Sequence, residues 1–311
     1  MTGGLRLCVD FGGTNIKMGL ASRGILVETA EFPITGSPSD LDAVAAAARA
    51  LGAGADDIAE LAVAVPGLVD AAGARLLQAH GKYEWMLGAD LRAWAQGAFG
   101  AYARVENDAR AALAGELATG VARGERNVAL LVLGTGIGTA VAADGVLLRG
   151  ASGAGGNLGG HVTVDWAGPR CNCGNVGCAE VFGGSWALAG RLRDAVGDAG
   201  APPAHAWRSR LSEGGIGFAE LFAAAEAGDR FAERVAADAV RAWGVLAVTC
   251  CHLVDPAVFV VAGGVARAGE TVLGPLETYV RAHIWSALPT PRFVLAADPA
   301  NAVLRGLAAG V

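Results

Sequence analysis

The 311-residue chain is 53% hydrophobic and 17% charged, so a sizeable core can form and extended disorder is excluded. Its length suits two domains of ordinary size or one large domain. A formal net charge of −6, with no basic cluster, gives no electrostatic reason to expect a nucleic-acid partner.

Neither a secretory leader nor a membrane span is expected. Asp10 interrupts the apolar start of the chain, and the longest apolar run, 245–254, is too short to cross a bilayer. Six cysteines in a chain of this size do not form a secreted disulfide framework. Three of them lie in apolar stretches that suit buried thiols in a reducing compartment: Cys8, Cys250 and Cys251. The sequence therefore predicts a soluble, cytoplasmic protein.

The first 32 residues predict a strand, a glycine turn and two more strands. Residues 5–11 form a short buried strand, and 18–22 and 25–32 continue as strands on either side of the Arg23-Gly24 turn. The glycines at the first turn free the backbone to bend, so that its amides can face a phosphate. The residues available at this turn are Gly12, Gly13, the Thr14 hydroxyl and Lys17, with Asp10 placed to hold Mg²⁺ through water. The alternative is an ordinary hairpin with an exposed Asp and Lys.

Between residues 39 and 120 the pattern alternates helices and strands. An Ala-rich helix is predicted over 39–53 with Ser39 or Asp40 as its N-cap, and the strand 61–70 is broken by Pro66-Gly67, which indicates a turn facing a cleft. The segment 80–95 begins as a polar loop and becomes a helix near Asp90.

The stretch 102–120 predicts a strand that runs directly into a helix. Asn107 and Asp108 stand at the junction, where either can cap the helix. Asp108 can act only as a cap that interacts with the helix dipole, or it can act as a general base at the bottom of a cleft. The local pattern leaves both roles open.

Residues 128–148 repeat the opening pattern of strand, glycine turn, strand, hairpin turn and strand. The second turn contains Gly134, Thr135, Gly136 and Gly138. It does not open a helix as a dinucleotide-binding motif requires, and no GxxxxGK[ST] sequence occurs. Two glycine turns at equivalent positions of two similar meanders can clamp one polyphosphate from both sides.

The stretch 156–180 holds four soft or borderline metal ligands within eighteen positions. An imidazole and three thiolates meet the requirement of a closed tetrahedral zinc site: His161, Cys171, Cys173 and Cys178. Glu180 follows two residues after the last cysteine, and a Gly-rich turn leads into the histidine. A metal clip flanked by such polar groups indicates a scaffold for a substrate pocket.

The remainder of the chain predicts mostly helices. Helices are expected over 185–196, 216–229, 231–255, 272–284 and 300–310, strands over 256–262 and 292–298, and a loop over 201–207. Gly263 and Gly264 follow a strand, where they either let the backbone approach a flat ring such as adenine or form a tight turn into a helix.

Five motifs taken together resemble the ROK family of bacterial sugar kinases and sugar-responsive repressors. They occur in the expected order over nearly the whole chain, at 10–17, 106–116, 133–141, 155–180 and 260–265. The resemblance implies an α/β, actin-like ATPase fold (hexokinase or ribonuclease H-like) with two domains built on duplicated β-meander and helix cores. Repressor members carry an N-terminal helix-turn-helix, for which the first motif at residue 10 leaves no room, so the kinase branch is expected.

The resemblance also implies a role for each matching residue. Asp108 is the general base that takes the proton from the sugar hydroxyl as it attacks the γ-phosphate of ATP. Sugar hydroxyls are bound by Asn107, His161 and Glu180. The zinc is held by His161, Cys171, Cys173 and Cys178, and it keeps His161 and the Glu180 turn rigid. The first phosphate loop comprises Asp10, Gly12, Gly13, Thr14 and Lys17, the second comprises Gly134, Thr135, Gly136 and Gly138, and Gly263 and Gly264 border the adenosine.

Two departures fall in the expected sugar pocket. Kinases of the family usually have Gly-Glu-x-Gly-His, where this chain has Asn157 and one extra residue before His161. An asparagine can still hydrogen-bond a hydroxyl, but it removes a charge, so Asn157 is the candidate for deciding which sugar fits. The loop 80–85 lacks the family's Asn-Leu pair, and Lys82, Tyr83 and Glu84 are the available replacements.

The sequence thus predicts a kinase that phosphorylates a hexose-type sugar, glucose-like or an N-acetylhexosamine, with Mg²⁺-ATP. The expected small domain covers 1–118 plus 300–311 and the large one 119–299, with one structural zinc per chain. The long apolar helices after residue 231 are expected to supply a homodimer interface. Neither nucleic acid nor membrane is an expected partner. The alternative is a non-catalytic, sugar-binding sensor or regulator of the same family.

Overall fold

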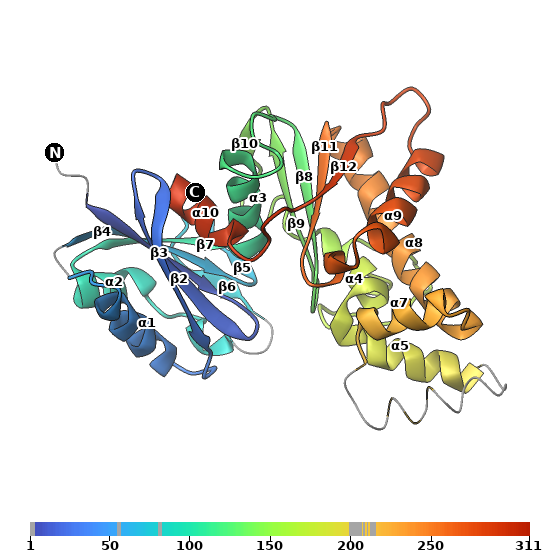
Figure 1. The fold of residues 1–311 in the computed structure, drawn as a ribbon, viewed down its shortest axis with the longest axis horizontal. Helices are drawn as coiled ribbons and strands as arrows, with labels where there is room; N and C mark the ends of the chain where they lie inside the picture. The colour runs from blue at the N-terminus through green and yellow to red at the C-terminus, as the bar shows by residue number, and fades with distance from the viewer. Residues whose placement is uncertain are drawn as a thin grey trace. The chain divides into compact units, whose positions relative to one another are not determined.

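The computed structural model describes residues 4–54, 57–79, 83–198, 207, 209, 211 and 216–311. The chain divides into two compact units, each assembled from separate stretches of sequence (Figure 1). The first unit comprises Met1–Arg126, Ala140–Asn157 and Ala296–Val311, and the second comprises Asn127–Thr139 and Leu158–Leu295. The predicted mixed α/β fold is confirmed.

A five-stranded sheet forms the centre of the first unit, in the order β3-β2-β1-β4-β7. The strands β1 (Leu5–Phe11), β2 (Asn15–Ser22) and β3 (Ile25–Pro33) form the antiparallel meander that the opening pattern predicts. β4 (Ile58–Val65) lies parallel to β1, and β7 (Tyr102–Asn107) lies parallel to β4. Because Asp10 pairs with Ala64 and Ala64 with Glu106, the carboxyl ends of the three parallel strands meet at one edge. Asp10 and Asn107 therefore lie at the same edge of the sheet.

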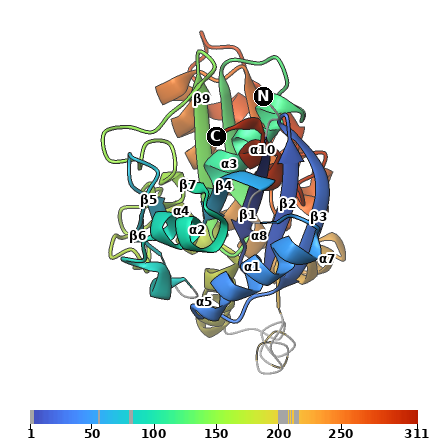
Figure 2. The same cartoon turned by 90° about the vertical axis from the view of Figure 1, so that its left-hand side faces the viewer.

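Helices cover both faces of this sheet (Figure 2). The strand β1 sends Leu7, Val9 and Phe11 to a core shared with α1 (Ser39–Ala50) and α2 (Leu91–Phe99). It sends Cys8 to the other side, into a smaller core shared with α3 (Asp108–Ala118) and α10 (Ala302–Ala309). This alternation follows from the two-residue period of a strand. The short elements β5 (Leu68–Val69), β6 (Leu76–Gln78) and η2 (Glu84–Met86) complete the unit.

The contact between α3 and α10 depends on two glycines. A Cβ atom added to Gly306 would collide with the carbonyl oxygen of Ala111, and one added to Gly115 would collide with that of Ala302. The two helix backbones therefore approach more closely than any residue with a side chain at these positions allows. In this way the last helix of the chain packs directly on the helix that begins at Asp108.

The second sheet has the order β10-β9-β8-β11-β12. Its strands are β8 (Val128–Leu133), β9 (Ile137–Ala143), β10 (Val146–Leu147), β11 (Val258–Ala262) and β12 (Arg292–Leu295). β11 is parallel to β8 and to β12, whereas β10 is antiparallel to β9. The helical elements of the second unit are η3 (Gly159–His161), α4 (Ala179–Gly183), α5 (Ser185–Asp198), α7 (Phe218–Glu226), α8 (Arg230–Val254), η4 (Val265–Ala268) and α9 (Glu270–His283).

The helix α8 is the longest of the described helices and supplies much of the core of the second unit. By length and composition alone it could cross a membrane. Its apolar side chains Phe231, Trp243 and Leu246 are instead buried with those of α7 and β11. Burial in the core of the unit therefore accounts for part of its apolar composition, since 39% of its most apolar window is buried.

Several local predictions need correction. The helix α1 begins at Ser39 with Pro38 as its N-cap residue, so the predicted side-chain cap by Ser39 or Asp40 is wrong. Asp40 is buried and accepts hydrogen bonds from the backbone N–H groups of Thr35 and Gly36, so it ties down the preceding turn. The helix expected directly after Gly263 and Gly264 begins as the 3₁₀ helix η4, and the loop 201–207 falls almost wholly outside the described residues.

Candidate active site

The polar residues at the β7–α3 junction lie at the predicted strand-to-helix transition. Asn107 is the N-cap of α3, and its Oδ1 accepts from the Arg110 N–H at 3.1 Å. Its Nδ2 donates to the carbonyl oxygen of Gly67 at 2.9 Å, which fixes the Pro66-Gly67 turn against the junction. The prediction that this turn interrupts a strand is confirmed, since β4 ends at Val65 and β5 begins at Leu68. Both ends of the Asn107 amide thus have partners within the protein.

Asp108 is the first residue of α3 and does not cap the helix. Its Oδ1 accepts from the N–H of Ala109 at 2.8 Å. Burial raises the pKa of this carboxyl from 3.8 to about 6, while backbone N–H groups and Asn107 oppose the rise. A carboxylate that binds a proton more tightly than an ordinary aspartate, yet is ionised at neutral pH, has the properties of a general base.

Asp10 is another carboxyl of raised pKa in the same unit, and its side chain is buried. Burial is the largest cause that raises its pKa to about 7, the negative charge of the neighbouring Asp108 contributes to the rise, and Lys17 opposes it. The two carboxyls therefore lie close enough to repel each other at the carboxyl edge of the sheet. Such a pair favours the binding of a cation, because a positive charge relieves both the repulsion and the cost of ionisation.

The first glycine turn is held in place at Gly12 and exposed at Gly13 and Thr14. A Cβ atom at Gly12 would lie 2.7 Å from the carbonyl oxygen of Asn15, so the position requires glycine, whereas Gly13 has no atom within 4 Å of such a Cβ. The buried Tyr83 donates its hydroxyl to the Gly12 carbonyl at 2.6 Å. Gly13 and Thr14 remain exposed, as a turn that receives a ligand requires.

Lys17 and the loop 80–85 differ in part from expectation. Lys17 lies on β2 opposite Asp10, and its Nζ donates to the carbonyl oxygen of Ala300 at 2.9 Å. Tyr83 donates its hydroxyl to the carbonyl of Gly12 and so holds the first glycine turn, which differs from the expected contact with a sugar. Lys82, proposed with Tyr83 as a replacement sugar contact, falls outside the described residues.

In the second unit, the second glycine turn is braced by Glu180. The buried Glu180 accepts from the Ile137 N–H through Oε2 at 2.8 Å and from the Trp186 Nε1 through Oε1 at 3.0 Å. A Cβ atom at Gly136 would lie 2.5 Å from Glu180 Oε2, so this approach requires glycine. The carbonyls of Gly134 and Thr135 accept from the first N–H groups of α5, at 3.1 and 3.0 Å. Glu180 thus orders the turn of residues 134–138, a role that the sequence did not reveal.

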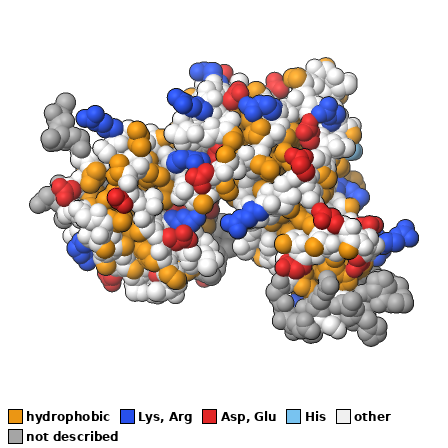
Figure 3. All heavy atoms as spheres, viewed as in Figure 1, with side chains coloured by type: hydrophobic (Ala, Val, Ile, Leu, Met, Phe, Trp, Pro, Cys, Tyr) orange, Lys and Arg blue, Asp and Glu red, His pale blue; other side chains and the backbone are white. Residues whose placement is uncertain are grey.

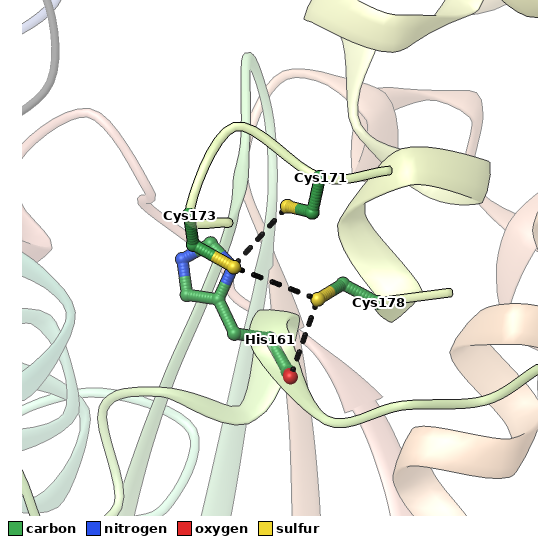
Figure 4. Close-up of side chains that lie close together, drawn as sticks. All are labelled: His161, Cys171, Cys173 and Cys178. Carbon is green, nitrogen blue, oxygen red and sulfur yellow. Dashed lines mark hydrogen bonds between the residues drawn. The ribbon is translucent and has the colours of Figure 1, made fainter. Parts of the chain in front are cut away.

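Four predicted metal ligands converge in the second unit (Figure 4). The ligand atoms of His161, Cys171, Cys173 and Cys178 all lie within 4.8 Å of one another. The sulfurs of Cys173 and Cys178 are 3.7 Å apart, and the same distance separates Cys171 Sγ from His161 Nδ1. Zinc–sulfur bonds of about 2.3 Å at tetrahedral angles place sulfurs about 3.8 Å apart. The donor set and its spacing therefore fit a tetrahedral metal site.

The local backbone explains how four ligands meet within so short a segment. Gly174 and Gly177 have φ values of 91° and 64°, which a residue with a side chain rarely adopts. At Gly177, a Cβ atom would also collide with the carbonyl oxygen of Asp165. His161 ends η3 and Cys178 immediately precedes α4, so Glu180 in the first turn of α4 is set by the same cluster.

The turn after β11 combines tight packing at one glycine with open space at the next. Gly263 has a φ of 95°, and a Cβ atom there would collide with the carbonyl of Leu133 at the end of β8. Gly264 has no atom within 4 Å of an added Cβ and so leaves open space beside the turn. Gly263 therefore packs closely on β8, and the open space lies beside the adjacent Gly264.

A buried polar network in the first unit holds Asn157 and includes three charged residues that the sequence did not single out. Arg110, 2% exposed, donates to Glu106 at 2.6 Å and to Asn157 Oδ1 at 2.6 Å. Arg149 pairs with the second oxygen of Glu106. The only sequence signal was the four-residue spacing of Glu106 and Arg110. The first unit thus groups Asp10, Asn107, Asp108 and Asn157 in one polar region, whereas His161, Glu180 and the second turn belong to the second unit.

On the face drawn in Figure 3, the described surface has no large patch of only positive or only negative side chains. Figure 3 shows Lys and Arg side chains interspersed with Asp and Glu. Exposed large hydrophobic side chains in the second unit include Trp166 at 90%, Leu253 at 78% and Trp285 at 69%.

Comparison with known proteins finds similarity over almost the whole chain. The model of the ROK family matches residues 6–310. A glucokinase from Thermotoga maritima is 37% identical over 186 residues, which cover 58% of this chain and 56% of that protein. The chain is thus aligned with about half the length of this relative. A glucokinase from Streptomyces coelicolor is 31% identical over 280 residues, which cover 88% of this chain and 86% of the relative.

A solved structure extends the similarity to the fold. The ROK family glucokinase from Streptomyces griseus, crystallised in complex with glucose and AMPPNP, superposes with a TM-score of 0.79 at 28% identity. The match covers 98% of each chain.

Proposed function

Because the chain belongs to the ROK family, we propose that it transfers the γ-phosphoryl group of ATP to a hydroxyl of a hexose-type sugar. The observation that carries the proposal is Asp108, a carboxyl of raised pKa at the start of α3 beside the N-cap Asn107. Full-length relatives named glucokinases and a relative crystallised with glucose and AMPPNP support the same reaction class. Glucose-like sugars and N-acetylhexosamines are the first candidates for the substrate.

In the proposed reaction Asp108 accepts the proton of the attacking hydroxyl. The sugar oxygen forms a bond to the γ-phosphorus as the bond to the leaving ADP oxygen breaks, and the proton passes to the carboxylate of Asp108. Phosphoryl transfer depends mainly on positioning and charge neutralisation, so a single well-placed base is sufficient. Asn107, Asn157, His161 and Glu180 are the proposed sugar contacts.

The two glycine turns are the proposed phosphate-binding elements. Gly13, Thr14 and Thr135 are exposed at the two turns, where backbone N–H groups and hydroxyls suit phosphate oxygens. The proposed phosphate-binding residues are Asp10, Gly12, Gly13, Thr14 and Lys17 in the first unit and Gly134, Thr135, Gly136 and Gly138 in the second. Gly263 and Gly264 are proposed to border the adenosine. Mg²⁺ bound with ATP would neutralise phosphate charge, and Asp10 is its proposed protein partner.

We further propose that the cluster of His161, Cys171, Cys173 and Cys178 holds one structural Zn²⁺. The soft donor set and the sulfur spacing of 3.7 Å support zinc over harder cations. The ion would fix the backbone on both sides of the cluster. It would hold His161 and, through α4, Glu180 in place. Groups that lie outside a binding site commonly orient the residues that contact the ligand in this way.

A sugar-panel assay tests the kinase proposal. Purified protein with Mg²⁺-ATP is given hexoses, hexosamines and N-acetylhexosamines in turn, and ADP release is measured. Asp108→Asn is expected to lower kcat by roughly 10²- to 10⁴-fold, the contribution of a general base. Asp42→Asn is the control, because Asp42 is exposed on α1 in the same unit and should leave turnover unchanged.

The second candidate is a non-catalytic sugar sensor, favoured by the neutral Asn157 in the sugar region. It predicts sugar binding by calorimetry without ADP release for any member of the panel. Turnover that depends on Asp108 excludes the sensor, whereas binding without turnover excludes the kinase.

Location, oligomeric state and domain division are proposed from the sequence. We propose a cytoplasmic homodimer whose contact involves the helices after residue 231, where Leu253 and Trp285 are exposed. Light scattering after gel filtration tests the dimer. The division into domains 1–118 plus 300–311 and 119–299 is likewise a proposal, to be tested by limited proteolysis.

A further inference from the structure

Asn157 is held in one orientation by a residue that can only donate hydrogen bonds. Its side chain is 9% exposed, and its Oδ1 lies 2.6 Å from Arg110 Nη2. Because a guanidinium has five N–H donors and no acceptor, the amide atom that faces it must be the oxygen. The amide nitrogen of Asn157 therefore points away from Arg110, and the orientation does not rest on an arbitrary choice between oxygen and nitrogen.

Arg110 cannot turn aside to release this amide. Besides Glu106, its guanidinium donates to the backbone carbonyls of Leu148 at 3.1 Å, Gly153 at 2.7 Å and Gly155 at 3.1 Å. These bonds fix the plane of the guanidinium and join the segment 148–157 to α3. The donor set of Arg110 is thus used within the first unit, and the orientation of Asn157 is set before any ligand binds.

The amide nitrogen of Asn157 is buried and has no hydrogen-bond partner among the described residues. A buried N–H group without an acceptor is rare in folded proteins, because its lost hydration is not replaced. The same Arg110 donates its backbone N–H to Asn107, the neighbour of Asp108. The unpartnered donor therefore belongs to the polar network that surrounds the proposed general base.

We propose that Asn157 Nδ2 donates a hydrogen bond to a sugar oxygen. Because Arg110 holds the Oδ1 of Asn157, the Asn157 side chain can offer the sugar only a hydrogen-bond donor. This inference rests on the proposed function, since it identifies what the sugar site requires of its substrate. A carboxylate at position 157 would accept, and would require a hydroxyl proton. The amide N–H requires only an oxygen lone pair on the sugar. The site therefore binds sugars that carry a hydroxyl, carbonyl or ether oxygen at the position facing Nδ2, and it rejects deoxy sugars that carry only hydrogen at that position.

A small local opening must accompany binding, because Nδ2 is covered in the present conformation. Residues 150–156 include four glycines, which lower the barrier to such a movement. Arg110 itself stays in place in this scheme, so the donor is uncovered without losing its orientation.

Matched deoxy and fluoro sugars test the proposal. Fluorine accepts a hydrogen bond weakly and cannot donate one, whereas hydrogen does neither. For each ring position, binding is measured by calorimetry and turnover by ADP release for the hydroxy, fluoro and deoxy forms of the preferred sugar. At one position the deoxy form is expected to bind at least about tenfold more weakly than the parent, and the fluoro form to recover a measurable part of that loss.

Asn157→Asp should abolish the tighter binding of the fluoro sugar relative to the deoxy sugar. A carboxylate paired with Arg110 accepts at the same point, so the fluoro sugar should bind no better than the deoxy sugar, while the hydroxy sugar is still bound. Gln96→Glu is the matched control, because it makes the same change of amide to carboxylate at an exposed site on α2 and should keep the wild-type pattern. Thermal melts of both variants establish that they are folded.

The outcomes separate this inference from the kinase proposal. Equal losses for fluoro and deoxy sugars at every position of the wild type, with turnover of the parent sugar, overturn the donor role and leave the kinase intact. The fluorine pattern in binding without turnover supports the donor role and overturns the kinase. If Asn157→Asp keeps the wild-type difference between fluoro and deoxy sugars, the donor is another residue and the inference is overturned. The inference is also overturned if the wild-type protein binds none of the sugars.

Discussion

The indole N–H of Trp186 donates to Glu180 at 3.0 Å, while the other oxygen of the same carboxylate accepts from the Ile137 backbone at 2.8 Å. The side chain of Glu180, a proposed sugar contact, is thus bonded both to the second glycine turn and to Trp186, which is 39% exposed. A ligand that binds Glu180 must alter the environment of this indole.

Sugar binding should therefore change the tryptophan fluorescence of the protein, and Trp186→Phe should remove most of the change. The chain has seven tryptophans, so a matched control is needed. Trp285→Phe is suitable, because Trp285 is 69% exposed and its side chain has no role in the proposed site. A full signal in Trp186→Phe would show that sugar does not act on Glu180.

The raised pKa of Asp108 should make the protein less stable as pH rises. A carboxyl that holds its proton more tightly in the folded state stabilises that state at low pH, and the contribution is lost between the unfolded and the folded pKa. For Asp108 this window runs from 3.8 to about 6. Asp108→Asn should therefore melt a few degrees higher than the wild type at pH 7.5, with the difference shrinking near pH 4.

The same group should also set the acidic limb of activity. kcat/KM is expected to fall below about pH 6, where Asp108 becomes protonated and can no longer accept a proton. A rate independent of pH between 5 and 8, or a destabilised Asp108→Asn at pH 7.5, would contradict the role given to this carboxyl.

Replacing one cluster ligand should cost both metal and stability. Cys173→Ser leaves three of the four ligands, so the zinc content measured by atomic absorption should fall from about one per chain, and the melting temperature should fall with it. Cys250→Ser is the control, since Cys250 lies on α8 outside the cluster. Equal metal content in the wild type and Cys173→Ser would rule out the site.

The crossing of α3 and α10 should not tolerate a methyl group. Gly306→Ala drives a Cβ atom into the Ala111 carbonyl and should lower the free energy of unfolding by about 1–3 kcal/mol, the usual cost of overpacking. Gly190→Ala, on α5 with no atom within 4 Å of the added Cβ, should be neutral or stabilising by up to about 1 kcal/mol. Urea denaturation of the two variants gives the comparison, and similar losses in both would refute the tight crossing.

Local signals in the sequence were enough to predict most helices and strands and to single out the four residues that cluster as candidate metal ligands. The two meanders, the strand-to-helix junction at 107–108 and the cysteine cluster depend on neighbours within a few residues, and each appears where the pattern placed it; of the two residues that could cap α3, the structure uses Asn107. The spacing of Cys171, Cys173 and Cys178 specifies a chemistry that few other arrangements satisfy.

The partners of the site residues could not be predicted, because they come from distant parts of the chain. Arg110 contacts residues 38 to 47 positions away, and Tyr83 reaches Gly12 across 71 positions. An isolated Arg on a helix looks like a solvated side chain, and only the fold shows that it is buried. The error at the start of α1 has a different origin, because Asp40 accepts hydrogen bonds from Thr35 and Gly36 in the turn before the helix, a local alternative to capping.

The placement of α10 has a consequence for how the protein is made. The first unit requires Ala302–Ala309 to cover Cys8, Ala62 and Ala111, so its smaller core cannot close until residue 309 has left the ribosome. The second unit is complete once residue 295 has emerged. During synthesis the unit that begins the chain is therefore expected to finish folding last, and a stalled ribosome would hold it with that core uncovered.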